Sequence, residues 1–247
     1  MKILLLDVET SPNTAFVWGL RNEFIPLARL IETSQVMCYS AKWFGTEEVY
    51  FDSIYESTRR SMLRGIYGLL DEADVVVHYN GQRFDIPVLN REFILNGFTP
   101  PAPYKQVDLL KVARNQFRFA SNKLDHIAQE LGLGAKHETS FTLWVDCMNK
   151  DPKAWETMKA YNVNDVILLE EVYKKFLPWI KNHPNHGVYG EHGMVCPKCG
   201  GVHSHRRGYA FTTAGKYQRY KCKDCGGWFR DANIQKNQAP KPKYANA

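Results

Sequence analysis

The sequence contains no long hydrophobic run. None of its uninterrupted apolar stretches is longer than Ile3 to Leu6, whereas a membrane-spanning helix needs about 20 apolar residues. The acidic Asp7 follows that stretch directly, so the N-terminus also lacks the apolar core of a secretory signal. These two absences predict an intracellular, cytoplasmic protein.

The sequence also shows no internal repeat and no strongly biased composition. Hydrophobic residues make up 44% of the 247 residues and charged residues 23%, and both values are near the average of globular proteins. They exclude a wholly disordered, collagen-like or coiled-coil chain. The length suffices for one large domain or two small ones with a sizeable core.

Acidic residues are scarce only near the C-terminus. Residues 1–193 hold 21 Lys and Arg against 24 Asp and Glu, a net charge of −3, whereas residues 194–247 hold 11 against 2, a net charge of +9. Such a dense basic excess indicates an anionic partner such as nucleic acid, although a solvated charged surface is the ordinary alternative.

Cysteine is rare as well, and the six cysteines occur in two settings. Cys38 and Cys147 stand alone among apolar neighbours, which is typical of core positions. The other four form two C-x-x-C pairs separated by 22 residues: Cys196, Cys199, Cys222 and Cys225. In a chain without a secretory signal, four thiolates in this pattern predict one structural Zn²⁺ rather than disulfides.

Hydrophobic periodicity predicts an α/β domain with a mixed sheet flanked by helices. We expect strands over 2–9, 36–44, 48–55 and 74–80 and helices over 58–72, 86–96, 108–117, 123–131 and 152–176, the last with Asp151 as its cap. The expected organisation is an α/β domain over residues 1–179, a linker over 180–193, a small zinc ribbon over 194–231 and a disordered basic tail over 232–247.

Four acids and a tyrosine lie on three of these elements. Asp7 and Glu9 end the first strand two residues apart, so both side chains point to one face of the sheet. Asp85 follows the fourth predicted strand by a short turn, and Tyr161 and Asp165 share one face of the last helix. Each has an ordinary alternative: a strand-end acid, a helix cap, or an exposed acid beside a half-buried tyrosine. Together, four carboxylates suit hard divalent cations such as Mg²⁺ or Mn²⁺.

The order of these residues resembles the motifs of the DEDD superfamily of 3′→5′ exonucleases. The run Leu6-Asp7-Val8-Glu9-Thr10 resembles the first motif, and the run from His78 to Pro87 resembles the second. Tyr161-x-x-x-Asp165 resembles the third motif in its tyrosine form, which marks the DEDDy branch. This branch includes the proofreading domain of family-B DNA polymerases. The resemblance covers roughly residues 1–177 and implies a ribonuclease H-like fold.

The resemblance also implies a two-metal-ion mechanism with two Mg²⁺ or Mn²⁺ ions. Asp7, Glu9 and Asp165 would hold the ion that binds the nucleophilic water. Asp7 would also contact the second ion, which Asp85 would hold through water. Tyr161 would orient the attacking water. Because a tyrosine pKa near 10 makes the side chain a poor base at neutral pH, the acidity that the metal gives the water must account for most of the deprotonation.

The segment from Cys196 to Phe229 resembles the zinc ribbons of some transposases and DNA-binding proteins. Basic residues alternate there with aromatic ones, a composition that can neutralise phosphates and stack on bases. Alternatively, the aromatic residues pack the small hairpin and the cations solvate it. We expect nucleic-acid contacts from one residue of the second exonuclease motif and six of the ribbon: Asn80, Arg206, Arg207, Lys216, Arg219, Tyr220 and Lys221.

The sequence therefore predicts a metal-dependent 3′→5′ exonuclease whose zinc ribbon binds the nucleic-acid substrate. DNA with a free 3′ end is the favoured partner, because both resemblances are to DNA-handling proteins, and replication or repair proteins are further candidates. A DDE-type transposase or integrase is one alternative, but it needs three acids and leaves Glu9 and Tyr161 without a role. A catalytically inactive nucleic-acid-binding module is the other, although no motif acid is missing.

Overall fold

The computed structural model describes residues 1–21, 24–134, 139–189 and 193–235. The chain divides into two compact units, Met1–Phe176 and Leu177–Ala247. Most of the predicted tail over 232–247 and part of the predicted linker lie outside the described residues. Within the described ranges, no helix is both long and apolar enough to cross a membrane.

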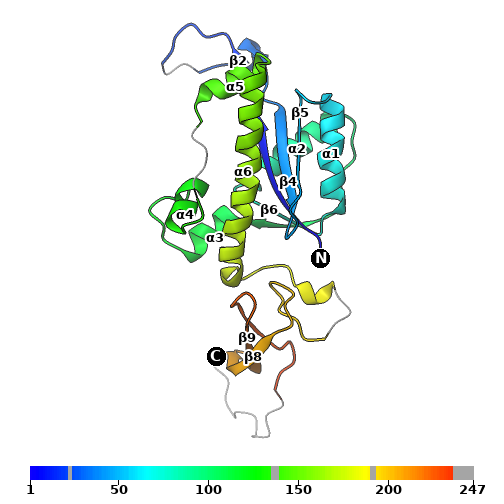
Figure 1. Cartoon of the computed structure of the whole chain (residues 1–247), viewed down its shortest axis with the longest axis vertical. Coiled ribbons are helices and arrows are strands. Elements are labelled where there is room, and N and C mark those ends of the chain that lie inside the picture. The colour runs from blue at the N-terminus through cyan, green and yellow to red at the C-terminus, as the bar shows by residue number, and fades with distance from the viewer. Residues whose placement is uncertain (22–23, 135–138, 190–192, 236–247) are drawn as a thin grey trace. The chain divides into compact units, whose positions relative to one another are not determined.

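A five-stranded mixed sheet forms the centre of the first unit, in the order β5-β4-β1-β6-β7 (Figure 1). Its strands are β1 (Ile3–Thr10), β4 (Val36–Trp43), β5 (Val49–Ser53), β6 (Val75–His78) and β7 (Lys105–Asp108). β4 is antiparallel to both β1 and β5, whereas β1, β6 and β7 are mutually parallel. This confirms the predicted fold class, a sheet that opens with a hairpin and continues with parallel crossovers.

Helices cover both faces of this sheet. α1 (Arg59–Glu72) and α2 (Asp85–Leu95) pack on the face to which Leu4, Leu6 and Val8 of β1 point. α5 (Phe141–Met148) and α6 (Pro152–Phe176) cover the other face, and α3 (Leu109–Gln116) and α4 (Leu124–Glu130) pack against α6. Because strand side chains alternate, Asp7 and Glu9 point to the α6 face.

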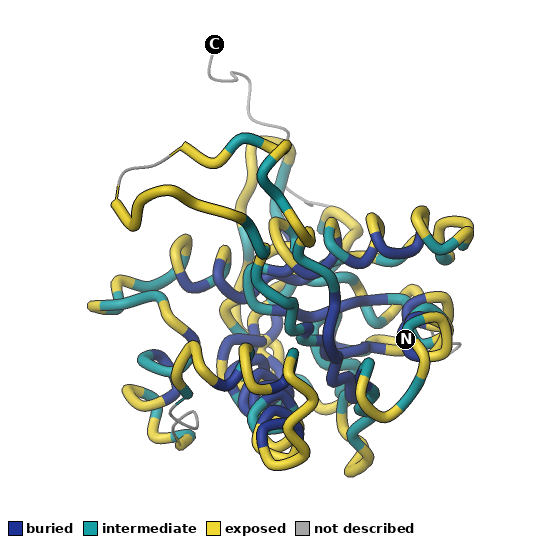
Figure 2. The backbone as a smooth tube through the Cα atoms, turned by 90° about the horizontal axis from the view of Figure 1, so that it is seen from above, coloured by how far each residue is buried: buried dark blue, intermediate teal, exposed yellow. Residues whose placement is uncertain are grey.

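The core lies between the sheet and its helices. Figure 2 shows buried residues along the strands, while exposed residues concentrate in loops and on the outer sides of helices. Cys38 and Cys147 are 0% and 1% exposed, which confirms their prediction as core residues. α6 begins as predicted at Pro152, and the Asp151 carboxylate caps it by accepting a 2.9 Å hydrogen bond from the Lys153 N–H.

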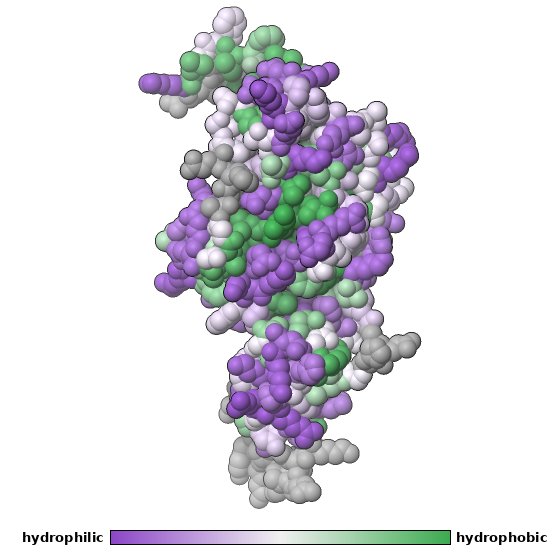
Figure 3. All heavy atoms as spheres, in the orientation of Figure 1, coloured by the Kyte–Doolittle hydropathy of each residue, from purple (hydrophilic) through white to green (hydrophobic). Residues whose placement is uncertain are grey.

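The segment between β1 and β4 was not predicted. It contains the short strands β2 (Thr14–Ala15) and β3 (Leu30–Glu32), which pair with each other. Several large apolar side chains of this segment are exposed: Phe16, Trp18, Leu20, Phe24 and Leu27. Hydrophobic residues gather at the end of the view in Figure 3 at which Figure 1 labels β2. Strands of two or three residues leave no periodic pattern, so nothing in the sequence pointed to this hairpin.

The second unit contains a three-stranded antiparallel sheet in the order β10-β9-β8. Its strands are β8 (Ser204–Thr212), β9 (Gly215–Cys222) and β10 (Trp228–Arg230). Part of the predicted linker contacts this unit's first cysteine pair, because the His186 N–H donates a 2.9 Å hydrogen bond to the Pro197 carbonyl. The domain boundaries stay predictions.

Candidate active site

Three carboxylates from β1 and α6 meet on the α6 face of the sheet. One carboxylate oxygen from each of Asp7, Glu9 and Asp165 lies within 4.8 Å of the others. Asp165 is buried, and Asp7 and Glu9 are partly exposed. Packing of α6 on β1 thus brings together acids that lie more than 150 residues apart in the sequence. The cluster offers the oxygen donors that Mg²⁺ and Mn²⁺ prefer.

Asp85 lies on the neighbouring α2 and is not part of this three-acid cluster. Its Oδ1 accepts a 3.1 Å hydrogen bond from the Val8 N–H, so its carboxylate reaches the strand that carries Asp7 and Glu9. Asp85 is the first residue of α2, and the preceding Phe84 makes no side-chain capping bond. An acid in the first turn also interacts favourably with the helix N-terminus, so Asp85 combines that placement with the contact to β1.

Tyr161 faces the acids from α6, one turn before Asp165. Its ring packs edge-on against Trp144 of α5, with the ring centroids 6.0 Å apart. Burial, followed by the negative charges of Asp165 and Glu9, raises the pKa of Tyr161 far above its usual value. The phenol therefore keeps its proton, and it can hold a water molecule but cannot act as a base.

Two residues of this site were not predicted from the sequence. The Asn162 Nδ2 donates a 2.7 Å hydrogen bond to Asp7 Oδ2, and the Trp144 Nε1 donates a 3.2 Å hydrogen bond to Glu9 Oε2. Asn162 is fully buried beside Tyr161, and a polar residue at that helix position was the available signal. Trp144 gave none, because its short helix α5 was not predicted. Both residues orient carboxylates of the cluster.

The turn between β6 and α2 is tightly built around the buried His78. The Gly81 N–H donates to His78 Nδ1 at 3.0 Å, so the other ring nitrogen donates to Gln106 Oε1, also at 3.0 Å. Burial lowers the pKa of His78, which favours this neutral ring. A Cβ at Gly81 would lie 2.4 Å from His78 Cγ, so only glycine fits there.

Asn80 has a left-handed backbone, φ 69°, and its N–H donates to Asp108 Oδ1 at 3.0 Å.

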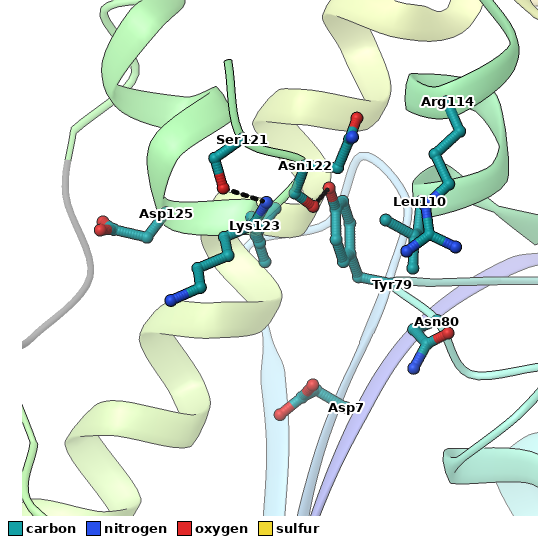
Figure 4. A pocket seen from close by; sticks show the side chains of 10 residues that line it. Asp7, Tyr79, Asn80, Leu110, Arg114, Ser121, Asn122, Lys123 and Asp125 are labelled. Carbon is teal, nitrogen blue, oxygen red and sulfur yellow. Dashed lines mark hydrogen bonds between the residues drawn. The ribbon is translucent and has the colours of Figure 1, made fainter. Parts of the chain in front are cut away.

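A cavity of about 580 Å³ opens beside Asp7 (Figure 4). Its wall comes from the β6 end, α3 and the start of α4: Tyr79, Asn80, Leu110, Arg114, Ser121, Asn122, Lys123, Leu124 and Asp125. The Tyr79 hydroxyl donates a 2.6 Å hydrogen bond to the Asn122 carbonyl and joins two parts of this wall. The cavity combines apolar surface with two cations, Arg114 and Lys123, so it suits a group that carries both a ring and a phosphate. The predicted contact residue Asn80 lies in this wall.

A sequence model of the RNase H superfamily matches residues 31–177, which is more than half of the chain. The chain belongs to the RNase H superfamily. The matched segment contains Asp85, Tyr161 and Asp165 and begins after β1, the strand of Asp7 and Glu9. A search of curated proteins found no match.

Among solved structures, this RNase H superfamily chain resembles the family B DNA polymerase from the hyperthermophilic archaeon Pyrobaculum calidifontis. The alignment has a TM-score of 0.53 and 22% sequence identity, and it covers 72% of this chain. It spans only 25% of the polymerase chain, so the comparison concerns a part of that protein. At this identity the likeness shows a shared fold.

The four cysteines lie beyond the segment that matches the RNase H superfamily, and they form a second candidate metal centre. The Sγ atoms of Cys196 and Cys225 are 3.8 Å apart, and those of Cys199 and Cys222 are 3.6 Å apart. Tetrahedral zinc with Zn–S bonds of about 2.3 Å places sulfurs about 3.8 Å apart, so the cluster fits one Zn²⁺.

Backbone N–H groups also point at two of these sulfurs. The Gly201 and Gly227 N–H groups donate to Cys199 and Cys225 at 3.4 Å. Such donors stabilise thiolates, which are the form that binds metal.

The ribbon residues expected to contact nucleic acid have different exposures. Four cations of the predicted set are exposed: Arg206, Arg207, Arg219 and Lys221. The fifth, Lys216, is half-buried, and its Nζ lies 3.8 Å from the ring centroid of Tyr209. Tyr220 is only 4% exposed, and its ring stacks on Phe229. Its ring therefore contributes to the packing of the ribbon itself.

Burial has a consequence for Asp85 that can be measured in metal-free protein. Burial raises the pKa of Asp85 to about 7. Because the folded-state pKa exceeds the unfolded value of about 3.9, the contribution of Asp85 to stability falls as the pH rises from about 4 to 7. We expect Asp85→Asn to raise Tm by about 5 °C at pH 8 and to have little effect at pH 4.

The measurement is thermal melting of metal-free wild type and variant at both pH values. Asp146→Asn, which changes an exposed acid, serves as the control and should alter Tm equally little at each pH. Equal melting temperatures of wild type and Asp85→Asn at pH 8 would contradict a buried, destabilising carboxylate.

Proposed function

We propose that this RNase H superfamily chain is a 3′→5′ exonuclease of the DEDDy type, which hydrolyses phosphodiester bonds of nucleic acid. The observation that carries the proposal is the convergence of Asp7, Glu9 and Asp165, with Asp85 hydrogen-bonded to their strand. Nucleases are typical of the superfamily, which supports nucleic acid as the substrate. DNA is favoured, because the similar solved structure is that of a DNA polymerase.

Each residue of the site has a separate role in the proposed reaction. Asp7, Glu9 and Asp165 would hold one Mg²⁺ or Mn²⁺, and Asp7 would also contact a second, which Asp85 would hold through water. Bound divalent ions lower the pKa of water and stabilise the charge on a leaving oxygen. Asn162 and Trp144 keep Asp7 and Glu9 oriented through their hydrogen bonds. The protonated Tyr161 positions the attacking water. The cavity beside Asp7 receives the nucleotide at the 3′ end.

The ribbon supplies affinity in this proposal. One structural Zn²⁺ on Cys196, Cys199, Cys222 and Cys225 holds the ribbon folded, and its cations bind phosphates. The basic residues concerned are Arg206, Arg207, Lys216, Arg219 and Lys221, with Tyr220 supporting them from the packed side.

The decisive experiment incubates single-stranded DNA with the protein and Mg²⁺, with the label at the 5′ end in one reaction and at the 3′ end in the other. An exonuclease of the proposed polarity gives a ladder of shortened 5′-labelled products and releases labelled mononucleotide from the 3′ end. Joined strands would instead identify a transposase, and unchanged strands an inactive binding module. Parallel reactions with RNA and with duplexes rank the substrates.

Tyr161→Phe should keep the fold and lower the single-turnover rate by about 10- to 100-fold. The phenyl ring preserves the contact with Trp144, and only the hydroxyl that positions water is lost. Tyr104→Phe, which changes a half-buried tyrosine outside the site, is the matched control and should retain the wild-type rate. An unchanged rate for Tyr161→Phe would leave Tyr161 with a packing role alone.

A further inference from the structure

The three-stranded sheet of the ribbon has two different sides. Side chains of β9 alternate, so Arg219 and Lys221 point to one side and Tyr220 to the other. In the register with β10, Trp228 lies opposite Lys221 and Arg230 lies opposite Arg219. Directly opposed residues share a side, so all four form one surface, the tryptophan face. Neither Trp228 nor Arg230 was expected from the sequence to bind anything.

The other side of the sheet carries a packed aromatic pair and a cysteine of the cluster, whereas on the tryptophan face the buried ring is that of Tyr217, which is 7% exposed. Tyr220 stacks on Phe229 with ring centroids 5.3 Å apart, and Cys222, which is 1% exposed, belongs to the cysteine cluster. Trp228, by contrast, is 47% exposed. The ribbon thus keeps about half of a large aromatic side chain on its surface.

Cations surround the exposed indole. The Arg219 Cζ lies 4.8 Å and the Lys221 Nζ 5.8 Å from the ring centroid of Trp228. On the same side, the Arg230 Cζ lies 3.9 Å from the ring centroid of Tyr217. Such cation–π contacts hold the charged groups beside the rings. Arg219 Nε also donates to the Arg207 carbonyl at 3.0 Å and Arg230 Nη1 to the Asp231 carbonyl at 2.9 Å, so the remaining N–H groups of each guanidinium are the ones that can bind an anion.

No carboxylate neutralises these cations within the described part of the ribbon. Residues 194–247 contain two acids, Asp224 and Asp231. Asp224 contacts His203 at 3.3 Å, and Asp231 accepts a 3.3 Å hydrogen bond from the Tyr220 hydroxyl. The positive charge of the tryptophan face is therefore uncompensated, which makes it complementary to a polyanion.

We propose that the tryptophan face binds single-stranded nucleic acid, with a base stacked on Trp228 and neighbouring phosphates held by Arg219, Lys221 and Arg230. A ring between cations that no carboxylate neutralises matches the alternation of bases and phosphates along a strand. Duplexes cover both faces of their inner bases, so only a single strand offers this stack. The inference deepens the ribbon part of the proposed function and rests on it.

The test measures binding by the full-length, zinc-loaded chain without added Mg²⁺ or Mn²⁺, so that cleavage does not interfere. The probes are a fluorescent oligodeoxythymidylate of about 20 nucleotides and a blunt duplex of equal length. Trp228→Ala should weaken binding of the single strand about tenfold and binding of the duplex less than about twofold. Trp228→Phe keeps a smaller ring and should lose only part of the affinity.

Two matched controls separate the tryptophan face from aromatic content and charge in general. Phe211 is 74% exposed but lies opposite Lys216 on the other side of the sheet, so Phe211→Ala should leave the affinity unchanged. Lys223 is an exposed cation of the ribbon that belongs neither to the tryptophan face nor to the phosphate-binding set of the proposed function. Arg219→Gln should reduce the slope of log affinity against log salt by about 0.7, whereas Lys223→Gln should leave it nearly unchanged.

Equal effects of Trp228→Ala and Phe211→Ala, equal effects of Arg219→Gln and Lys223→Gln, or equal affinity for duplex and single strand would each overturn the inference. If Trp228→Ala loses zinc, the Trp228→Phe and Arg219→Gln variants decide. Cleavage with Mg²⁺ is scored separately. Cleavage together with Trp228-independent binding overturns this inference alone, and Trp228-dependent binding without cleavage overturns the nuclease proposal alone.

Discussion

Asp7→Asn and Glu9→Gln are each expected to reduce cleavage of single-stranded DNA in Mg²⁺ to less than about 1% of the wild-type rate. Both carboxylates belong to the three-acid cluster, and removal of either charge takes a ligand from the proposed ion. The folds should persist, because the amide oxygen introduced by Asp7→Asn can still accept the hydrogen bond that Asn162 now donates to Asp7.

The measurement is the single-turnover rate at saturating protein, with binding determined in parallel. Binding should remain largely intact, since the ribbon is unchanged. Glu47→Gln, which alters an exposed acid in the turn between β4 and β5, is the control and should keep full activity. If both site variants retain more than a few per cent of the rate, the metal assignment is wrong.

Replacement of Cys222 and Cys225 by serine should have the second large effect. Loss of two thiolates removes the Zn²⁺ site, and a segment of this size without metal cannot bury enough surface to fold. We expect about one zinc less per chain, weaker nucleic-acid binding, and a shallower dependence of log affinity on log salt. Deletion of residues 194–247, which removes nine net positive charges, should act in the same direction.

The first unit should remain active on short oligonucleotides at low salt in both the serine variant and the deletion. A double variant with His203→Ala and His205→Ala is the control. It should keep its zinc, because the four thiolates fit the ion without histidine. If the slope of log affinity against log salt is the same for the intact and the truncated protein, the ribbon does not bind nucleic acid. Docking to a protein would then be the better explanation of the ribbon.

Long elements and the order of motifs were predictable from the sequence. β1 and α6 carry periodic apolar residues over many positions, so their bounds differ from the predicted ranges by a residue or so. β7 and α5 were missed, because β7 contains a single apolar residue and α5 is apolar nearly all round, so neither shows an alternating or helical pattern. As a result Trp144, the α5 residue that donates to Glu9, could not be assigned to the site.

The sequence by itself determined that Asp7 and Glu9 share a face, that Tyr161 and Asp165 share another, and that four cysteines come in two pairs. These statements rest on the fixed repeats of strand and helix, which are local properties of the chain. Only the tertiary structure decided that Asp165 meets Asp7 and Glu9, that Asn162 holds Asp7, and that Trp228 and Tyr220 lie on opposite sides of the ribbon. Those relations depend on helix packing and strand register, and both arise between segments whose contacts no local pattern encodes.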